Sequence, residues 1–305
     1  MDKPLISVIT INYNGLKHTR GMLESFQKIT YPNVEIIVVD NASKEDPSIL
    51  LEEFPEILLV KNPVNEGFAG GNNRGIEIAK GSYFFLINND TVVSPNVLEG
   101  LLDRATKSEQ VGLVCPKINY FDDDTIIQYA GFSNINPITG RGSGIGYQEK
   151  DSGQFQDPRV TYLAHGAAMF IPRKVVEEVG MMAELYFLYY EEMDYCERIK
   201  KAGYEIWYEP SASILHKESM SVGKNSLLKT FYMSRNRWVF LRRNVEWPVF
   251  LLTSLYYFFI ALPKNIVMHL FKGEFKHASA YVRGFTKSIF IKDLHDNPPL
   301  TANTP

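Results

Sequence analysis

The sequence predicts an α/β fold: a mostly parallel sheet with flanking helices, followed by a C-terminal helical extension. Two observations carry this prediction. Short, continuous apolar runs rich in β-branched residues alternate with helical patterns through the first half of the 305 residues, which is typical of strands covered on both faces. From residue 226 onward the pattern is helical.

Five apolar runs in the first half are predicted strands: residues 5–11, 34–40, 56–60, 82–88 and 111–116. Helices are predicted to begin at Asp46-Pro47 and Ser94-Pro95, where an N-cap residue precedes a proline at the first helical position. Both helices then start just beyond the carboxyl ends of strands. In open α/β sheets ligands bind at that edge, so we expect the site there.

The second half begins with an irregular segment, residues 119–165, whose Gly-rich part 136–146 is predicted to be a mobile loop. Regular elements return after it. They are predicted helices at 173–180 and 191–204, the latter ended by Gly203, and short strands at 205–209 and 212–216.

Composition fits a folded soluble protein, with 45% apolar and 22% charged residues. The net charge of −3 conceals an asymmetry, because residues 217–305 carry 13 Lys and Arg against 5 Asp and Glu, and residues 1–216 carry 19 against 30. The basic tail is expected either to face an anionic partner or to dock on its own acidic front. The N-terminus enters a strand pattern directly, and Cys115 and Cys196 lack metal-ligand spacing, so we expect a cytoplasmic protein.

The tail contains an aromatic, uncharged run from Trp247 to Leu262. Its 16 residues are fewer than the roughly 20 needed to span a bilayer, and prolines bracket it. Arg242, Arg243 and Lys264 flank it. We interpret the run as a helix lying in a membrane interface, with a buried helix or a dimer contact as the alternative.

Asp90 ends the segment "LINND", directly after a predicted buried strand. A lone carboxylate there could cap a turn, or it could hold a divalent cation whose shell phosphates and water complete. Asn88 and Asn89 lie beside it, and His216, at the end of "ASILH", could be a second ligand, which would suit manganese better than calcium.

Two further candidates lie near the same expected edge. Asp40 ends the strand "VEIIVVD" and could accept hydrogen bonds from a nucleoside or simply close a turn. Gly67, Gly70 and Gly71 belong to a Gly-rich segment that opens a helix and suits an anion. The spacing is neither a dinucleotide fingerprint nor a P-loop, so neither NAD binding nor ATP hydrolysis is indicated.

Glu191, Glu192 and Asp194 open a predicted helix after the aromatic run "LYFLYY". Acids in a first turn favour the helix dipole. A carboxylate beside an apolar wall can also act as a general base on a hydroxyl group.

Taken in order, these segments resemble the family 2 glycosyltransferases, particularly the rhamnosyltransferase-like branch. The matching segments run from residue 5 to about 244 and are "SVITINYNG", "VVDNAS", "NEGFAGGNNRG", "LINNDTVV", "HGAAMFIPRKVVEEVG", "LYYEEMDYCERIKKAGY", "ILH" and "YMSRNRWVFLRRN". The resemblance implies a Rossmann-like GT-A fold, a nucleotide-sugar donor, a divalent cation (Mn or Mg) and inversion at the anomeric carbon. It divides the chain into a catalytic domain 1–225, with a donor half at about 1–118 and an acceptor half at 119–225, and an extension 226–305.

The resemblance also implies roles for individual residues. Glu192 stands where the family has its catalytic acid, with Glu191 as the second candidate base, and Asp90 with His216 is predicted to hold the metal. Asn88 stands where many members have another acid. The acceptor side is assigned to Asp194, His165 and Gly166. The predicted donor-binding residues are Asn12, Asp40, Asn65, Gly67, Asn72, Asn73, Asn89, Arg235 and Arg237. The two arginines could contact the donor diphosphate or, as the alternative, a lipid phosphate on the acceptor.

The expected function is transfer of a sugar, with rhamnose favoured, from dTDP-rhamnose or a UDP-sugar to a glycan or lipid-linked acceptor in cell-surface polysaccharide synthesis. The alternatives are a catalytically silent nucleotide-sugar binder or scaffold, and a nucleotidyltransferase. The segment "NYNGLKHTR" has a single Gly where nucleotidyltransferases place a Gly-rich loop. Nucleic-acid binding is not expected. A peripheral place on the inner face of the cell membrane would suit a lipid-linked acceptor.

Overall fold

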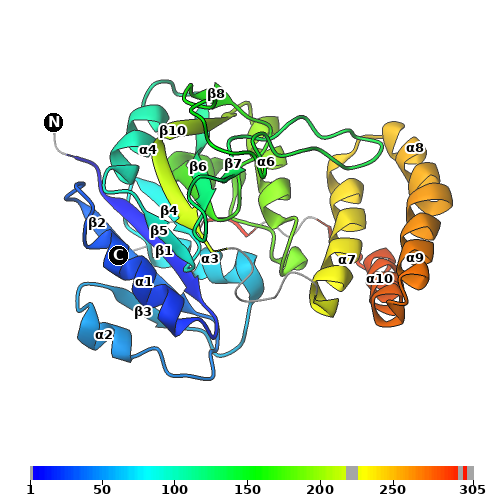
Figure 1. The fold of residues 1–305 in the computed structure, drawn as a ribbon, viewed down its shortest axis with the longest axis horizontal. Helices are drawn as coiled ribbons and strands as arrows, with labels where there is room; N and C mark the ends of the chain where they lie inside the picture. The colour runs from blue at the N-terminus through cyan, green and yellow to red at the C-terminus, as the bar shows by residue number, and fades with distance from the viewer. Residues whose placement is uncertain (1–2, 218–225, 295–297, 301–305) are drawn as a thin grey trace.

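A computed structural model describes residues 3–217, 226–294 and 298–300. The α/β class is confirmed: one ten-stranded mixed sheet carries helices, and a helical extension lies at one end of the molecule (Figure 1). The strands are β1 (Ile6–Asn12), β2 (Val34–Asp40), β3 (Leu58–Lys61), β4 (Tyr83–Ile87), β5 (Thr91–Val93), β6 (Val111–Tyr120), β7 (Ile127–Tyr129), β8 (Arg159–Val160), β9 (Ala168–Pro172) and β10 (Glu205–His216).

The sheet order is β3-β2-β1-β4-β9-β6-β10-β5, with β7 paired to β6 and β8 to β10. The first four strands of that order are parallel, and so are β6 and β10. Strands β9, β5, β7 and β8 run antiparallel to their neighbours. The predicted mostly parallel sheet is therefore more mixed than expected, because β9 inserts between β4 and β6.

Register brings the carboxyl ends of the parallel strands to one edge. Asn12 at the end of β1 pairs with Asp40 at the end of β2, and β4 ends at Ile87 on the other side of β1. At the far side, His216 at the end of β10 pairs with Thr91 at the start of β5. Polar residues that follow β4 and β10 therefore meet across this edge.

The helices of the sheet domain cover both faces. Helix α3 packs on β1 and β2, and α4 packs on β6 and β10. Their bounds are α1 (Leu16–Phe26), α2 (Ile49–Glu53), α3 (Gly67–Ile78), α4 (Val97–Ala105), α5 (Arg173–Val179) and α6 (Glu191–Lys201), with a 3-10 turn η1 (Glu184–Tyr186).

Two predicted helix starts are two residues early. Helix α2 has its N-cap at Ser48 and α4 at Asn96, and neither side chain accepts a capping hydrogen bond from the first turn of its helix. Asp46 instead accepts hydrogen bonds from the Ser48 amide and hydroxyl, which closes a turn before the helix. The predicted end of α6 is confirmed, because Gly203 follows it at φ +92°.

The extension consists of α7 (Leu227–Asn244), α8 (Val249–Tyr256), a π turn η2 (Tyr257–Ala261), α9 (Leu262–Phe271) and α10 (Phe275–Ile289). Helix α7 contacts α6 on one side and α10 on the other (Figure 1). At Gly284 on α10 an added Cβ would lie 2.3 Å from the Phe231 carbonyl oxygen, so glycine permits this close crossing of α7 and α10. The division into domains at 225/226 stays a prediction.

The helix that contains the aromatic run of the tail is longer than expected. Helices α8 and α9 join through η2 into one helix, Val249–Phe271, of 23 residues with a mean hydropathy of 1.4 in its most apolar window. Pro263 does not end it, because the wider π turn before the proline relieves the demand for a regular backbone hydrogen bond there. By length and composition alone this helix is sufficient to cross a membrane.

The loop 136–146, predicted to be mobile, contacts the extension. The carbonyl oxygen of Pro137 accepts from Thr253 on α8, and that of Thr139 accepts from Arg237 on α7. Gly140 lies against Leu241. The loop thus joins the sheet domain to α7 and α8.

Candidate active site

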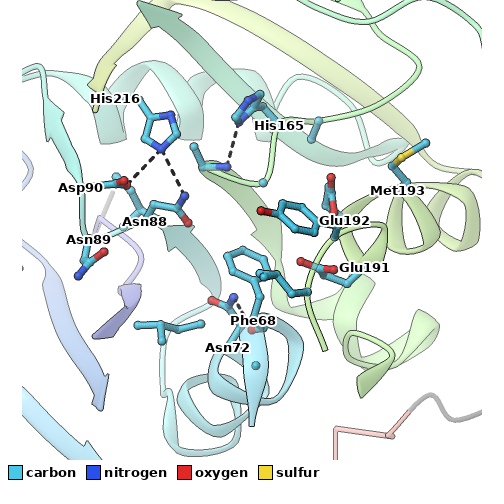
Figure 2. Close-up of a pocket in the computed structure, with 18 of the residues that line it drawn as sticks. Phe68, Asn72, Asn88, Asn89, Asp90, His165, Glu191, Glu192, Met193 and His216 are labelled. Atoms are coloured by element: carbon cyan, nitrogen blue, oxygen red, sulfur yellow. Dashed lines mark hydrogen bonds and ion pairs between the residues drawn. The ribbon is translucent and has the colours of Figure 1, made fainter. Parts of the chain in front are cut away.

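A cavity of about 470 Å³ opens at the carboxyl edge of the sheet, between the turn after β4, the start of α3, the start of α6 and the end of β10 (Figure 2). The predicted site residues that line it are Asn65, Gly67, Asn72, Asn89, Asp90, His165, Gly166, Glu191, Glu192 and His216. Those that do not line it are Asn12, Asp40, Asn73, Asp194, Arg235 and Arg237.

Asp90 and His216 face each other on one wall of the cavity. Asp90 Oδ1 lies 3.1 Å from His216 Nε2, and Asn88 Nδ2 lies 3.4 Å from the same nitrogen (Figure 2). His216 Nδ1 lies 2.8 Å from Gln128 Oε1, an oxygen that can only accept, so Nδ1 carries the hydrogen. In the neutral ring Nε2 then presents a lone pair to a carboxylate oxygen, an arrangement that requires a proton or a cation between them.

The Asp90 carboxylate fits a cation site. It is 6% exposed, and its Oδ1 makes no hydrogen bond despite the contact with His216. Burial opposes its ionisation, but the close contact with His216 outweighs burial, so the pKa of Asp90 lies below its ordinary value. One carboxylate and one imidazole suit Mn²⁺ or Mg²⁺ when phosphate and water supply the other ligands. Within the described ranges no cluster of three His, Cys, Asp or Glu forms a metal cage.

Glu191 and Glu192 lie across the cavity from Asp90, in the first turn of α6 (Figure 2). Glu191 is 3% exposed, and its Oε2 has no hydrogen-bond partner. Burial, and then the neighbouring charge of Glu192, raise the pKa of Glu191 well above its ordinary value, and burial also raises the pKa of Glu192. A carboxylate with a raised pKa is a better proton acceptor, as a general base requires.

The turn that presents these two acids has an unusual backbone. Phe187, Tyr189 and Tyr190 have φ values of +65°, +68° and +77°, which side chains larger than glycine rarely adopt. Such a segment persists only when its surroundings hold it in place.

Helix α7 supplies those surroundings. Asn236 Nδ2 lies 2.9, 2.8 and 2.9 Å from the carbonyl oxygens of Tyr186, Leu188 and Tyr189. Arg235 donates to the carbonyl oxygens of Leu185 and Tyr186. Sequence reasoning missed Asn236, although it lies inside the quoted segment "SRNR", because nothing local shows that its partners are about 50 positions earlier.

Neither arginine of that segment reaches the main cavity, contrary to the predicted contact with the donor diphosphate. Arg235 is engaged by the turn before α6, and Arg237 donates to Thr139 and lines a second cavity.

The Gly-rich segment is fastened to the same turn. Gly67 has φ +74°, and an added Cβ would lie 2.2 Å from the Phe187 carbonyl oxygen, which accepts a 2.7 Å hydrogen bond from the Phe68 amide. Asn65 Oδ1 accepts from the Gly67 amide, and Asn72 Nδ2 donates to the Phe68 carbonyl. The close approach of two backbones thus explains the glycine.

Asp40 and Asn12 form a buried network behind the cavity. Asn12 Nδ2 donates to Asp40 Oδ1 over 2.7 Å, and the Ser43 amide donates to Asp40 Oδ2, as the turn-closing alternative expects. Thr19 Oγ1 donates to Asn12 and accepts from Asn89. Asn89 alone of this network lines the cavity, so the network positions it.

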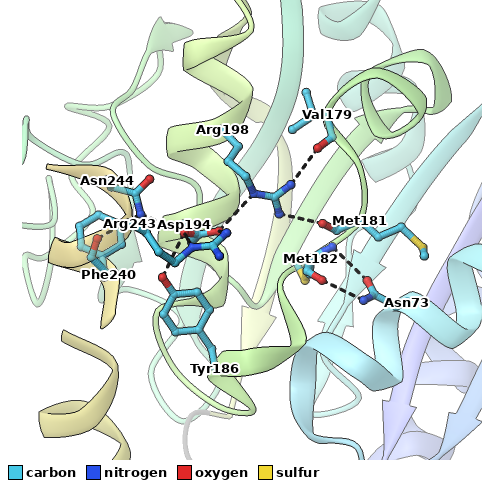
Figure 3. Close-up of polar contacts among 10 residues, drawn as sticks. All are labelled: Asn73, Val179, Met181, Met182, Tyr186, Asp194, Arg198, Phe240, Arg243 and Asn244. Atoms are coloured by element: carbon cyan, nitrogen blue, oxygen red, sulfur yellow. Dashed lines mark hydrogen bonds and ion pairs between the residues drawn. The ribbon is translucent and has the colours of Figure 1, made fainter. Parts of the chain in front are cut away.

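Asp194 has a structural place rather than one on the acceptor side (Figure 3). It is fully buried, and it accepts from Arg243 Nε at 2.7 Å, from Arg198 Nε at 3.1 Å and from Tyr186 and Asn244. Burial opposes its ionisation, but the arginines outweigh burial and lower the pKa of Asp194. The carboxylate therefore fixes α6 to α7.

Asn73 is likewise structural (Figure 3). Its amide exchanges hydrogen bonds of 2.9 and 3.1 Å with the backbone of Met182 and donates to Glu184. It therefore connects α3 to the segment that leads into α6.

His165 and Gly166 do line the cavity. His165 Nδ1 accepts from the Ala167 amide, and burial, with the neighbouring His216, lowers the pKa of His165 to about 3. The ring is therefore neutral at physiological pH and acts as an acceptor. Gly166 lies against Glu192, whose Cγ would be in ordinary van der Waals contact, at 3.7 Å, with an added Cβ.

The model of a known protein family, "Glycosyl transferase family 2", matches residues 7–180, more than half of the chain. The chain belongs to glycosyl transferase family 2. The predicted family is thereby confirmed, and the protein is a glycosyltransferase that uses a nucleotide-sugar donor. Membership in this family does not support the nucleotidyltransferase alternative.

Individual relatives agree with this assignment. The chain is 23% identical over 258 residues to an N-acetylglucosaminyl-diphospho-decaprenol L-rhamnosyltransferase of Mycobacterium tuberculosis (strain ATCC 25618 / H37Rv). The aligned region covers 78% of this chain and 84% of that protein. It is 27% identical to the uncharacterized glycosyltransferase RP339 of Rickettsia prowazekii over 59% of this chain and 54% of that protein. The rhamnosyltransferase-like branch is thus represented among the relatives.

Two solved structures have the same fold at 14% identity. A mannosyltransferase of Pyrobaculum calidifontis in complex with GDP-Man and Mn²⁺ has a TM-score of 0.57 and covers 96% of this chain and 89% of its own. GalNAc-T7 with UDP, GalNAc and Mn²⁺ has a TM-score of 0.65 and covers 95% of this chain and 56% of its own. The predicted GT-A fold is confirmed by this likeness.

Proposed function

We propose that this glycosyltransferase is a cation-dependent, inverting enzyme that moves a sugar, with rhamnose favoured, from a nucleoside diphosphate to a hydroxyl group of a glycan or glycolipid. One observation carries the proposal: Asp90 and His216 stand on one wall of the cavity and Glu191 and Glu192 on the other (Figure 2). Rhamnose is favoured by the relative from Mycobacterium tuberculosis.

The chain's residues divide the chemistry between these walls. Asp90 Oδ1 and His216 Nε2 would hold the cation, which when bound supplies positive charge to the donor diphosphate. Glu192 takes the proton of the acceptor hydroxyl, while the oxygen of that hydroxyl forms the new bond to C1 of the donor sugar. The bond from C1 to the diphosphate breaks at the opposite face, and the nucleoside diphosphate leaves with the electron pair. Glu191 is the second candidate for the base.

A thermal-shift panel with dTDP, UDP, GDP and NAD, each with and without Mn²⁺, tests the donor site. A ligand that binds only the folded state at 100 times its Kd adds about 2.7 kcal/mol of stability. We expect a shift with a pyrimidine diphosphate that requires Mn²⁺. No metal-dependent shift with any nucleotide would contradict the proposal and favour the silent-scaffold alternative.

We propose further that the exposed face of the helix Val249–Phe271 lies on a membrane, which would place the enzyme beside a lipid-linked acceptor. Only 17% of the most apolar window of this helix is buried, and Leu252, Phe259 and Phe271 are 55%, 76% and 89% exposed. Of the three cationic residues predicted to flank this helix, Arg242 and Arg243 have partners inside the protein. Arg243 pairs with Asp194, and Arg242 donates to backbone carbonyls of the extension, so neither faces outward.

Replacing Leu252, Phe259 and Phe271 together by glutamate is expected to reduce co-sedimentation with anionic phospholipid vesicles more than tenfold. Burying such a side chain is worth about 1.5–3 kcal/mol, and a charge at the same place is unfavourable in the interface. The matched control is Val64→Glu with Val160→Glu, since both valines are exposed on the sheet domain. Equal sedimentation of the triple variant and the native chain would contradict the membrane contact.

A further inference from the structure

A second cavity of about 420 Å³ lies beside the first, between α7, α9, α10 and the loop 136–146. Lys229 lines both cavities. Tyr190, which immediately precedes Glu191, lines the second. Figure 1 shows α7, α9 and α10 gathered at this end of the molecule. The two spaces therefore adjoin at the residues that present the acids.

The lining of the second cavity is basic. Its cationic and imidazole side chains come from the loop and from three helices, and they are Arg141, Lys229, Arg237, His269 and His277. Glu274 is the acid of the lining, and its Oε2 lies 2.8 Å from His269 Nδ1. His277 Nδ1 contacts the Thr230 hydroxyl at 2.8 Å. The acid is thus engaged, while Arg141, Lys229 and Arg237 face the space with no carboxylate partner among the described residues.

Arg237 is the decisive residue. It is only 7% exposed, and it donates to the Thr139 carbonyl and lies over the Tyr257 ring at 5.4 Å. Its Nε nevertheless has no hydrogen-bond partner. A buried N–H without an acceptor and a buried guanidinium charge without a carboxylate are both costly, and a bound anion would relieve both costs. A guanidinium group matches the oxygens of phosphate.

We propose that this second cavity binds the phosphate or diphosphate group of a lipid-linked acceptor, next to the catalytic acids. The inference rests on the proposed function, because it assigns the acceptor side of that reaction. Asn265 and His269 on α9 line the cavity, and the same helix carries Val267, Leu270 and Phe271, all exposed. A lipid chain leaving the cavity therefore meets an apolar surface, which a free phosphate would not use.

The test is isothermal titration calorimetry of the full chain with farnesyl diphosphate, below its micellar concentration, and with inorganic pyrophosphate. EDTA is present throughout, so that the Asp90–His216 site does not bind diphosphate through a metal. We expect farnesyl diphosphate to bind, and to bind more tightly than pyrophosphate. Equal affinity would overturn the assignment to a lipid, and no binding of either would overturn the site.

Arg237→Gln and Arg141→Gln are each expected to weaken farnesyl diphosphate binding about tenfold. Arg141 is exposed, so its variant tests the site even if the substitution of buried Arg237 impairs folding. The matched control is Arg283→Gln, exposed on α10, and Asp90→Asn is a second control; neither should change the affinity. Unchanged affinity in both test variants would contradict the proposal. The metal-dependent nucleotide shift is measured separately, so its failure would count against the proposed function and leave this site standing.

Discussion

The substitution Glu192→Gln is expected to lower kcat for sugar transfer by about 10³-fold while the affinity for the nucleoside diphosphate stays within about twofold. Glutamine keeps the size of the side chain but cannot accept a proton. Glu192 lies across the cavity from Asp90 and His216, so its loss should not disturb the donor side (Figure 2). Kinetics at saturating donor give kcat, and calorimetry with the nucleoside diphosphate and Mn²⁺ gives the affinity.

Glu191→Gln is the matched comparison, because the two acids are adjacent and both line the cavity. If Glu192 is the base, the Glu191 variant should keep much more activity. The reverse order would transfer the role to Glu191. Full activity in both variants would remove the acids from the mechanism, and loss of nucleotide binding together with activity would indicate a structural role.

The pH profile gives an independent check of the same base. Burial raises the pKa of Glu192 and of Glu191 above the value of about 4.3 that an exposed glutamate has. A base works only when deprotonated, so kcat/KM should fall as the pH drops through this raised pKa. We therefore expect the acid limb of the profile above about pH 4.3, and we expect the residual activity of the variant without a base to lack that limb.

Most strands of the sheet could be predicted from the sequence because a continuous apolar run is a local signal. Residues 34–40 and 82–88 are continuous apolar runs; strand β2 has the predicted bounds, and β4 is one residue shorter at each end. Strand β9, Ala168–Pro172, was missed although all five residues are buried, because a short run ending in proline has no period of its own. Its insertion between β4 and β6 depends on packing and made the sheet more mixed than predicted.

Site residues could be predicted from the sequence where a reactive side chain follows the end of a strand or opens a helix. Asp90, His216, Glu191 and Glu192 are such residues, and the fold brings all four to one cavity. Asp194, three residues along the same helix from Glu191, does not line the cavity and pairs with Arg243 instead. Sequence shows that a residue is acidic, but its partner about 50 positions away is determined by how α7 packs on α6.

The second large effect is expected for Asp90→Asn, which should weaken nucleoside diphosphate binding in Mn²⁺ about 100-fold or more and leave binding without metal unchanged. Asparagine has the same shape, and its amide can donate to His216 Nε2, which lies 3.1 Å from the present carboxylate oxygen. The fold should therefore survive, and the melting temperature without ligand verifies this. Transfer should fall in parallel, because the leaving diphosphate loses its counter-charge.

Asn88→Asp is the opposite change at the same place, since Asn88 Nδ2 lies 3.4 Å from His216 Nε2 and lines the same cavity. A second carboxylate beside Asp90 raises the negative charge of the site, so we expect a lower Mn²⁺ concentration to give half-maximal nucleotide binding. The two variants should thus move the metal dependence in opposite directions. Metal-independent binding in both would show that Asp90 and His216 form an ordinary buried ion pair, because a pair that holds no cation has no reason to respond to manganese.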